Sequence, residues 1–125
     1  MKKLLGFSIF LVFVLIASLT AEAKVTLPAI FSDNMVLQQN TQVNVWGKAA
    51  PGEKVTVKAS WLDKAVTAKA AANGKWTVKL KTPKAITNQS VTVSGENEIT
   101  INNVLIGEVW LCTGQSNMEF PVSRH

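Results

Sequence analysis

Ser116 is the residue of this 125-residue chain whose type and setting best suit covalent chemistry. The apolar run of residues 108–112 precedes it, and the small and polar residues 113–117 surround it. This order predicts a buried strand that ends in a sharp turn, with Ser116 at the strand's carboxyl end. Open α/β sheets carry their chemistry there, because backbone N–H groups of the turn can face a ligand. Ser116 is therefore a candidate nucleophile, and Gln115 and Asn117 are candidates for shaping its pocket.

Ser116 also fits a purely structural role. Residues 116–119, Ser-Asn-Met-Glu, match the capping box that begins many helices. Pro121 would then occupy the fifth helical position, where its ring and missing N–H stop a helix after about one turn. Such a short turn remains compatible with a nucleophile, because its N–H groups would favour negative charge at Oγ. The G-x-S-x-G elbow of general α/β-hydrolases is not matched, since Met118 replaces its last glycine.

Residues 107–122, GEVWLCTGQSNMEFPV, closely resemble the nucleophile block of the sialate O-acetylesterases, a branch of the SGNH hydrolases. Residues 27–39, LPAIFSDNMVLQQ, resemble the mature N-terminus of the same family, and residues 45–53 continue the match. Thr113 departs from the family pattern, in which serine is more frequent. The resemblance implies an esterase that removes O-acetyl groups from sialic acids, with Ser116 as the covalent catalytic residue.

The resemblance also implies partners for Ser116: a histidine base in a downstream D-x-x-H block, and an oxyanion site of backbone N–H groups with downstream Gly and Asn. His125 is the only histidine and lies in the wrong block, so it is not assigned as the base. We expect the chain by itself to be inactive, to need no cofactor, and to have an O-acetylated sugar as its partner when full length. Two alternatives remain: a free-standing β-sandwich that binds glycans or packs on a partner, and an acetylxylan-type deacetylase of the same superfamily.

The first residues predict an export signal. Lys2 and Lys3 begin it, residues 4–19 are almost wholly apolar, and residues 21–23, Ala-Glu-Ala, provide a small-x-small cleavage signature. The apolar run has about sixteen residues, fewer than the ~20 of a spanning helix, which favours cleavage over a membrane anchor. No cysteine follows the run, which argues against a lipoprotein. We expect a mature chain that begins at Lys24, is periplasmic or extracellular, and keeps no stable membrane anchor.

Composition argues against several other classes. Without Lys2, Lys3 and Glu22 the formal net charge falls from +5 to +4, and the remaining lysines stand mostly singly. A nucleic-acid groove needs clustered basic residues with interleaved aromatics, so we assign the lysines to a solvated strand face. Cys112 is the only cysteine, and its apolar setting predicts a small buried hydrophobe. One histidine and one cysteine cannot assemble a usual zinc site, so no metal is expected.

Residues 24–104 have the pattern of an all-β domain. Apolar and polar residues alternate with period two in several short runs, as in a sheet with one solvated face. The runs are residues 42–46, 54–58, 75–80, 90–94 and 98–101. We therefore expect a mainly β fold: a β-sandwich-like domain over residues 24–104, followed over residues 105–125 by the first strand and turn of an α/β SGNH hydrolase domain.

Two finer predictions concern this domain. Asn73-Gly74 predicts a hairpin between residues 65–71 and 75–80, because glycine tolerates the positive φ of such a turn. The alanines of that first segment also fit a helical turn, but the flanking strands favour a strand. Trp46, Trp61 and Trp76 are the expected large core residues, with a carbohydrate-stacking platform as the alternative.

Overall fold

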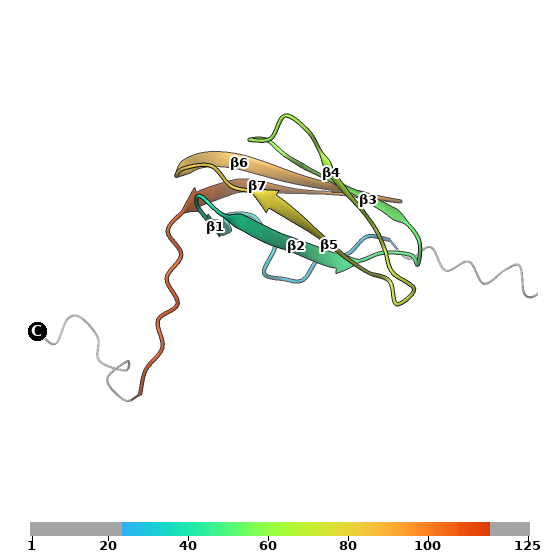
Figure 1. Ribbon diagram of the computed structural model, residues 1–125, viewed down its shortest axis with the longest axis horizontal. Helices are drawn as coiled ribbons and strands as arrows, with labels where there is room; N and C mark the ends of the chain where they lie inside the picture. The colour runs from blue at the N-terminus through green and yellow to red at the C-terminus, as the bar shows by residue number, and fades with distance from the viewer. Residues whose placement is uncertain (1–23, 116–125) are drawn as a thin grey trace, which may run out of the picture.

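The computed structural model describes residues 24–115. The predicted leader, residues 1–23, and residues 116–125, which include Ser116 and Asn117, lie outside this range. The described part of the chain folds into seven strands without a helix, which confirms the mainly β prediction (Figure 1). The strands are β1 (Val36–Gln38), β2 (Gln42–Lys48), β3 (Lys54–Ala59), β4 (Val66–Lys69), β5 (Lys75–Lys81), β6 (Ile86–Ser94) and β7 (Glu98–Gly107). Residues 24–115 contain no helix with the length and apolar character required to cross a membrane.

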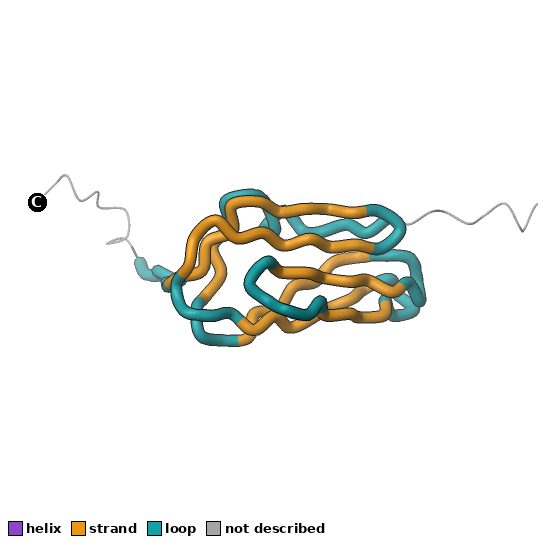
Figure 2. The backbone as a smooth tube through the Cα atoms, turned by 90° about the horizontal axis from the view of Figure 1, so that it is seen from above, coloured by secondary structure: helices purple, strands orange, loops and turns teal. Residues whose placement is uncertain are grey.

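The strands form two sheets around one core. The larger sheet has the order β1-β7-β6-β3-β4, and β2 pairs with β5 in the smaller one. The β1–β7 pair is parallel, and the other pairs are antiparallel. In the view of Figure 2 the strands run lengthwise and the loops gather at the two ends.

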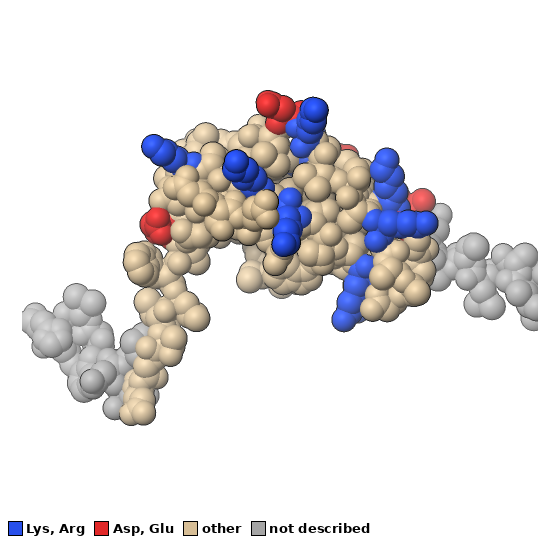
Figure 3. Space-filling model, viewed as in Figure 1, with Lys and Arg blue, Asp and Glu red and all other residues tan. Residues whose placement is uncertain are grey.

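Period-two alternation decides which side chains enter the core. In β5 every second residue is buried, namely Trp76, Val78 and Leu80, and the lysines and threonine between them are exposed. β3 contributes Val55 and Val57 from the opposite sheet, both fully buried. Each such Val or Leu side chain stabilises the fold by about 1.5–3 kcal/mol. Lysines are spread over the face visible in Figure 3, as expected of solvated strand faces.

The Asn73-Gly74 turn forms, but it joins different sheets. Gly74 has φ +74°, and hydrogen bonds join Gly74 N to Ala71 O and Ala71 N to Lys75 O. β4, however, pairs with β3, and β5 pairs with β2. The predicted hairpin between residues 65–71 and 75–80 is therefore wrong, although residues 66–69 are a strand as expected. The Asn73-Gly74 turn reverses the chain direction, whereas packing of the two sheets on the core decides which strands pair.

The tryptophans divide between core and surface. Trp76 is 2% exposed and lies in the core as predicted. Trp61 is half-buried against the core, and its Nε1 donates to Lys81 O at 2.9 Å. The core prediction for Trp46 is wrong, because Val45 and Gly47 are the inward residues of β2, and Trp46 between them is 41% exposed.

β7 is longer than the sequence indicates. Its pairing with β6 shifts register twice, and Asn103 and Asn88 at the two shifts have positive φ of 52° and 57°. The shift at Asn103 places an extra residue in β7, a β-bulge, so the buried positions continue as Val104 and Ile106. The pattern break near residue 104 is thus a bulge inside one continuous strand. The assignment of residues 105–125 to a second domain remains a prediction.

Candidate functional site

The predicted site residues lie at the end of the described chain. Gln115 is the last residue of that range and is exposed in a bend. Ser116 and Asn117 lie outside the described residues, and the structure describes the chain that leads to them. That route begins where β7 ends at Gly107.

Residues 35–39 hold the end of β7 by backbone pairing. β1 runs parallel to β7, with Leu37 opposite Ile106 and Gln38 opposite Gly107. The backbone N–H of Gln39 then donates to Gly107 O at 2.8 Å, one step past the end of the strand. Leu37 and Ile106 are both buried, so apolar packing supports the pairing on its core side. The exit of the chain from the sheet is consequently fixed in register.

Two adjacent glutamines bind the carboxylate that follows this strand. Gln38 Nε2 donates to Glu108 Oε2 at 3.0 Å, and Gln39 Nε2 donates to Glu108 Oε1 at 2.6 Å. We call Gln38, Gln39 and Glu108 the glutamine clamp. The hydrogen bond from Gln38 has the largest effect on the pKa of Glu108, and that from Gln39 is next. Both hold this pKa below its usual value, and desolvation opposes them. The clamp therefore favours the ionised form of Glu108.

The amide oxygens of both glutamines are also occupied. Gln38 Oε1 accepts from the backbone N–H of Val109 at 2.8 Å, and Gln39 Oε1 accepts from that of Ala85 at 2.8 Å. Each glutamine thus donates to Glu108 with its nitrogen and fixes backbone with its oxygen. Of the first two residues after β7, Glu108 is held through its side chain and Val109 through its backbone N–H.

A second contact pins the bulge in β7. Asp33 Oδ1 accepts from the backbone N–H of Asn102 at 2.6 Å, and Asn34 Oδ1 accepts from Asn103 Nδ2 at 2.7 Å. Asn34 N also donates to Asn102 O at 3.1 Å. Residues 33–39 therefore contact β7 from its bulge to its exit. The first stretch of the family resemblance, residues 27–39, thus contacts the start of the second, residues 107–109, although about 70 residues separate them in sequence.

No local pattern predicted a role for Gln38, Gln39, Asp33 or Asn34 beyond their place in the resemblance. Their partners are distant in sequence, and amide and carboxylate side chains at a strand end are usually solvated. The sole local signal is that two consecutive amides directly follow an apolar strand. Long-range hydrogen bonds of this kind become visible once the strand order is known.

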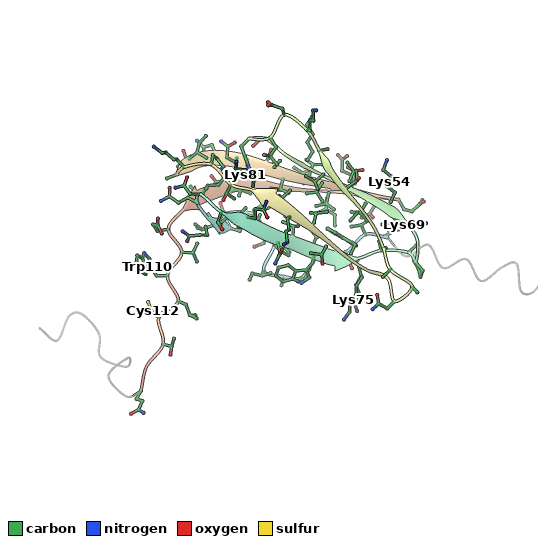
Figure 4. All side chains as sticks on the ribbon, viewed as in Figure 1. Lys54, Lys69, Lys75, Lys81, Trp110 and Cys112 are labelled. Carbon is green, nitrogen blue, oxygen red and sulfur yellow. The ribbon has the colours of Figure 1, made fainter. Side chains whose placement is uncertain are left out.

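The segment after the clamp lies away from the sheets. Trp110 is 81% exposed and Leu111 91% exposed, and the chain leaves the body of the fold there (Figures 1 and 4). The predicted strand at residues 108–112 is not formed, and the prediction that Cys112 is buried is wrong, since it is exposed. An apolar strand of this kind needs neighbouring strands to cover it, and no strand within residues 24–115 pairs with this segment.

The described residues offer a scaffold rather than a reacting group. Within residues 24–115 no three His, Cys, Asp or Glu side chains are grouped so that they could hold a metal ion. The carboxylate of Glu108 is bound by two amides that carry no charge and cannot relay a proton at neutral pH. The arrangement can therefore hold the chain at Glu108 and Val109, where it leaves β7.

Comparison with known proteins agrees with this organisation. No family model matches the chain. It is 31% identical over 107 residues to sialate O-acetylesterase from Mus musculus, and 30% identical over 101 residues to that from Homo sapiens. These alignments cover 77% and 73% of this chain, and 20% and 19% of the relatives.

A solved structure shows the same relationship. The crystal structure of a carbohydrate acetylesterase from Xanthomonas citri matches with a TM-score of 0.72 and 37% sequence identity. The match covers 80% of this chain and 23% of that protein. Over most of its length the chain is therefore similar to the sialate O-acetylesterases, and it spans about a fifth of the length of the relatives it matches.

Proposed function

We propose that this chain is the N-terminal part of an exported serine esterase that hydrolyses O-acetyl esters of sialic acids. The observation that carries the proposal is the docking of residues 33–39 onto β7 and Glu108, which holds the first two residues of the segment leading to Ser116. Both stretches that resemble the family take part in this contact. The activity belongs to the longer protein, because the relatives extend well beyond the matched region.

In the proposed reaction Ser116 is the nucleophile. Its Oγ attacks the acetyl carbonyl carbon, and a histidine from the rest of the protein accepts the Oγ proton. Backbone N–H groups stabilise the oxyanion, the sugar hydroxyl leaves with a proton from that histidine, and the acetyl group stays on Ser116. Water then gives a proton to the histidine and attacks the acetyl carbonyl carbon, and acetate is released as the bond to Ser116 Oγ breaks and Oγ regains its proton from the histidine. Gln115 and Asn117 are assigned to the shape of the pocket around Ser116.

The second candidate keeps the chemistry and changes the sugar. The relative from Xanthomonas citri is described as a carbohydrate acetylesterase, a wording that names no particular sugar. An acetylxylan-type deacetylase therefore remains the alternative enzyme. The two substrate assignments are separated by measuring kcat/KM of the intact protein on an O-acetylated sialic acid and on acetylated xylo-oligosaccharides, at equal acetyl concentration. A higher kcat/KM on the xylo-oligosaccharides would reject the sialic acid assignment.

The proposal also concerns the chain alone. A serine hydroxyl is a weak nucleophile until a base accepts its proton. We expect residues 24–125 to release no acetate above a buffer blank, whereas the intact protein turns over. If residues 24–125 did release acetate, and Ser116→Ala abolished that release, the base would lie within these residues.

A further inference from the structure

A hollow lies at the end of the smaller sheet that is remote from the glutamine clamp. Its volume is about 450 Å³, and it is lined by residues 26–28, by residues 46–48 of β2 and by residues 75–77 of β5. β2 begins beside the clamp, because Thr82 Oγ1 donates to Gln38 O and to the O of Thr41, the residue just before β2. The other end of β2 is Lys48. Figure 4 places Lys75, which pairs with Lys48, at the opposite end of the fold from Trp110. The hollow is thus separate from the segment that leads to Ser116.

One wall of the hollow is tied down by backbone hydrogen bonds. Thr26 N donates to Lys48 O at 2.9 Å, and Lys48 N donates to Thr26 O at 3.0 Å, which adds the first described residues to the edge of β2. Gly47 makes this close approach possible, because a Cβ there would overlap Thr26 O and lie 2.9 Å from Cζ2 of Trp76. The hollow is a built feature of the fold.

Trp46 supplies an aromatic surface beside it. Trp46 is 41% exposed and lies on the outer face of β2. The ring of Phe31 packs against it edge-to-face, with ring centroids 4.7 Å apart and an interplanar angle of 79°. A fixed and partly exposed indole binds with little loss of side-chain entropy, because its orientation is already set. Flat apolar surfaces of this kind suit the C–H face of a sugar ring.

Two lysines supply positive charge on the same face. Lys48 and Lys75 are directly opposite each other in the β2–β5 ladder, and Trp46 is opposite Thr77 in the adjacent outward-facing pair. Like charges directly opposite on a sheet repel, and an anion between them offsets this repulsion. Trp76 also lines the hollow, and its buried Nε1 has no hydrogen-bond partner within residues 24–115. Apolar, hydroxyl and cationic groups therefore converge here.

We propose that this hollow binds an acidic sugar residue without transforming it. The sugar ring packs on the indole of Trp46, its carboxylate lies between the ammonium groups of Lys48 and Lys75, and the hydroxyls of Thr26 and Thr77 are available to its hydroxyl groups. Neither Ser116 nor esterase activity is required. The site would hold an acidic glycan at a distance from the catalytic segment.

The structure provides a matched control pair. Lys54 and Lys69 are also directly opposite each other and exposed, in the β3–β4 ladder, and they do not line this hollow. If charge alone attracts acidic sugars, both lysine pairs bind equally. If the hollow and Trp46 are required, binding is confined to Lys48 and Lys75.

The test is a ¹H–¹⁵N NMR titration of residues 24–125 with trigalacturonate, and with its fully methyl-esterified form as the neutral counterpart. We expect the Trp46 indole N–H and the amides of Gly47 and Lys48 to shift. The Trp61 indole N–H, held by Lys81 O, serves as the internal reference that does not shift. The acid should bind about fivefold more tightly than the ester, as expected for exposed ion pairs.

Variants complete the experiment. Trp46→Ala should weaken binding about tenfold, from the loss of its aromatic surface. The double variant Lys48→Gln, Lys75→Gln should remove the preference for the acid, and Lys54→Gln, Lys69→Gln should leave it unchanged. The lysine variants change exposed side chains, so they test the proposal even if Trp46→Ala does not fold. Equal shifts with sodium citrate, equal affinity for acid and ester, or shifts at Lys54 and Lys69 would each overturn it.

Discussion

Gln39 Nε2 donates a 2.6 Å hydrogen bond to Glu108 Oε1 across 69 residues of sequence. The acceptor is ionised, which makes such a hydrogen bond shorter and stronger than one between neutral groups. With Gln38 bound to the other carboxylate oxygen, both oxygens of Glu108 have an amide donor. Glu108, the first residue after β7, is therefore held by Gln38 at the end of β1 and by Gln39 directly after it.

The first prediction is that Gln38 holds the backbone just after β7. Gln38→Ala removes the acceptor of the Val109 N–H, so amide hydrogen exchange at Val109 should quicken by about fivefold, corresponding to the ~1 kcal/mol of one hydrogen bond. NMR-detected exchange measures this. Gln42→Ala, at an exposed glutamine outside the clamp, is the control. Unchanged exchange at Val109 would show that the backbone is held by other means.

The second prediction concerns pH. Folding lowers the pKa of Glu108, so the ionised clamp contributes stability above the ordinary glutamate pKa of about 4.3 and loses it as pH falls through the lower, folded value. The side-chain NH₂ resonances of Gln38 and Gln39 should therefore move together in an acid titration, with a midpoint below the ordinary value. Glu108→Gln should abolish this transition. A midpoint above the ordinary value would contradict the lowering of the Glu108 pKa by the two amide donors.

The third prediction concerns Gly47. A Cβ at this position would overlap Thr26 O and crowd the indole of Trp76, and both neighbours are held by backbone pairing or burial. Gly47→Ala should lower the free energy of unfolding by about 2–4 kcal/mol, measured by urea denaturation. Gly107→Ala is the matched control, because a Cβ there meets nothing within 4 Å. Similar losses for the two variants would refute the steric explanation.

The fourth prediction is that Ser116 is the covalent nucleophile of the intact protein. Removing Oγ deletes the acyl-enzyme route, so Ser116→Ala should lower kcat by a factor on the order of 10³ to 10⁶. KM should change far less, since Oγ is one of many substrate contacts. Ser123→Ala should retain near wild-type kcat. Retention of more than about a tenth of the rate, or organophosphonate labelling of a different serine, would overturn the assignment.

The fifth prediction is that Lys24 begins the mature, exported chain. The basic start, the apolar run and the Ala-Glu-Ala signature motivate it. N-terminal sequencing and intact mass of material recovered from the periplasm or the medium provide the measurement. A soluble exported product that retains Met1 would contradict it.

Local patterns were sufficient to predict most of the strands and several turns, although they missed β1 and predicted a strand at residues 108–112 that is not formed. Side chains alternate across a strand by backbone geometry alone, so the runs at residues 54–58 and 75–80 identified β3 and β5. Pro51-Gly52, a dipeptide typical of turns, forms a turn with Glu53 N donating to Ala50 O and Gly52 at φ +80°. These features depend on neighbouring residues, which is why the sequence determined them.

Strand pairing and the scaffold of the site were decided by the tertiary structure. The Asn73-Gly74 turn is compatible with a hairpin, yet β4 and β5 pair in different sheets, because each must cover the core from its own side. Val45 and Trp46 are adjacent in β2, so their side chains point to opposite faces. Which of the two is buried depends on where the other sheet lies. The bulge at Asn103 and the bond between Gln39 and Glu108 join segments whose proximity no local pattern encodes. The sequence by itself thus determined most of the strands, their main turns and the resemblance to a family, because these depend on neighbouring residues. The pairing of β1 with β7, which only the tertiary structure decides, determined which residues hold Glu108 and Val109 where the chain leaves the sheet.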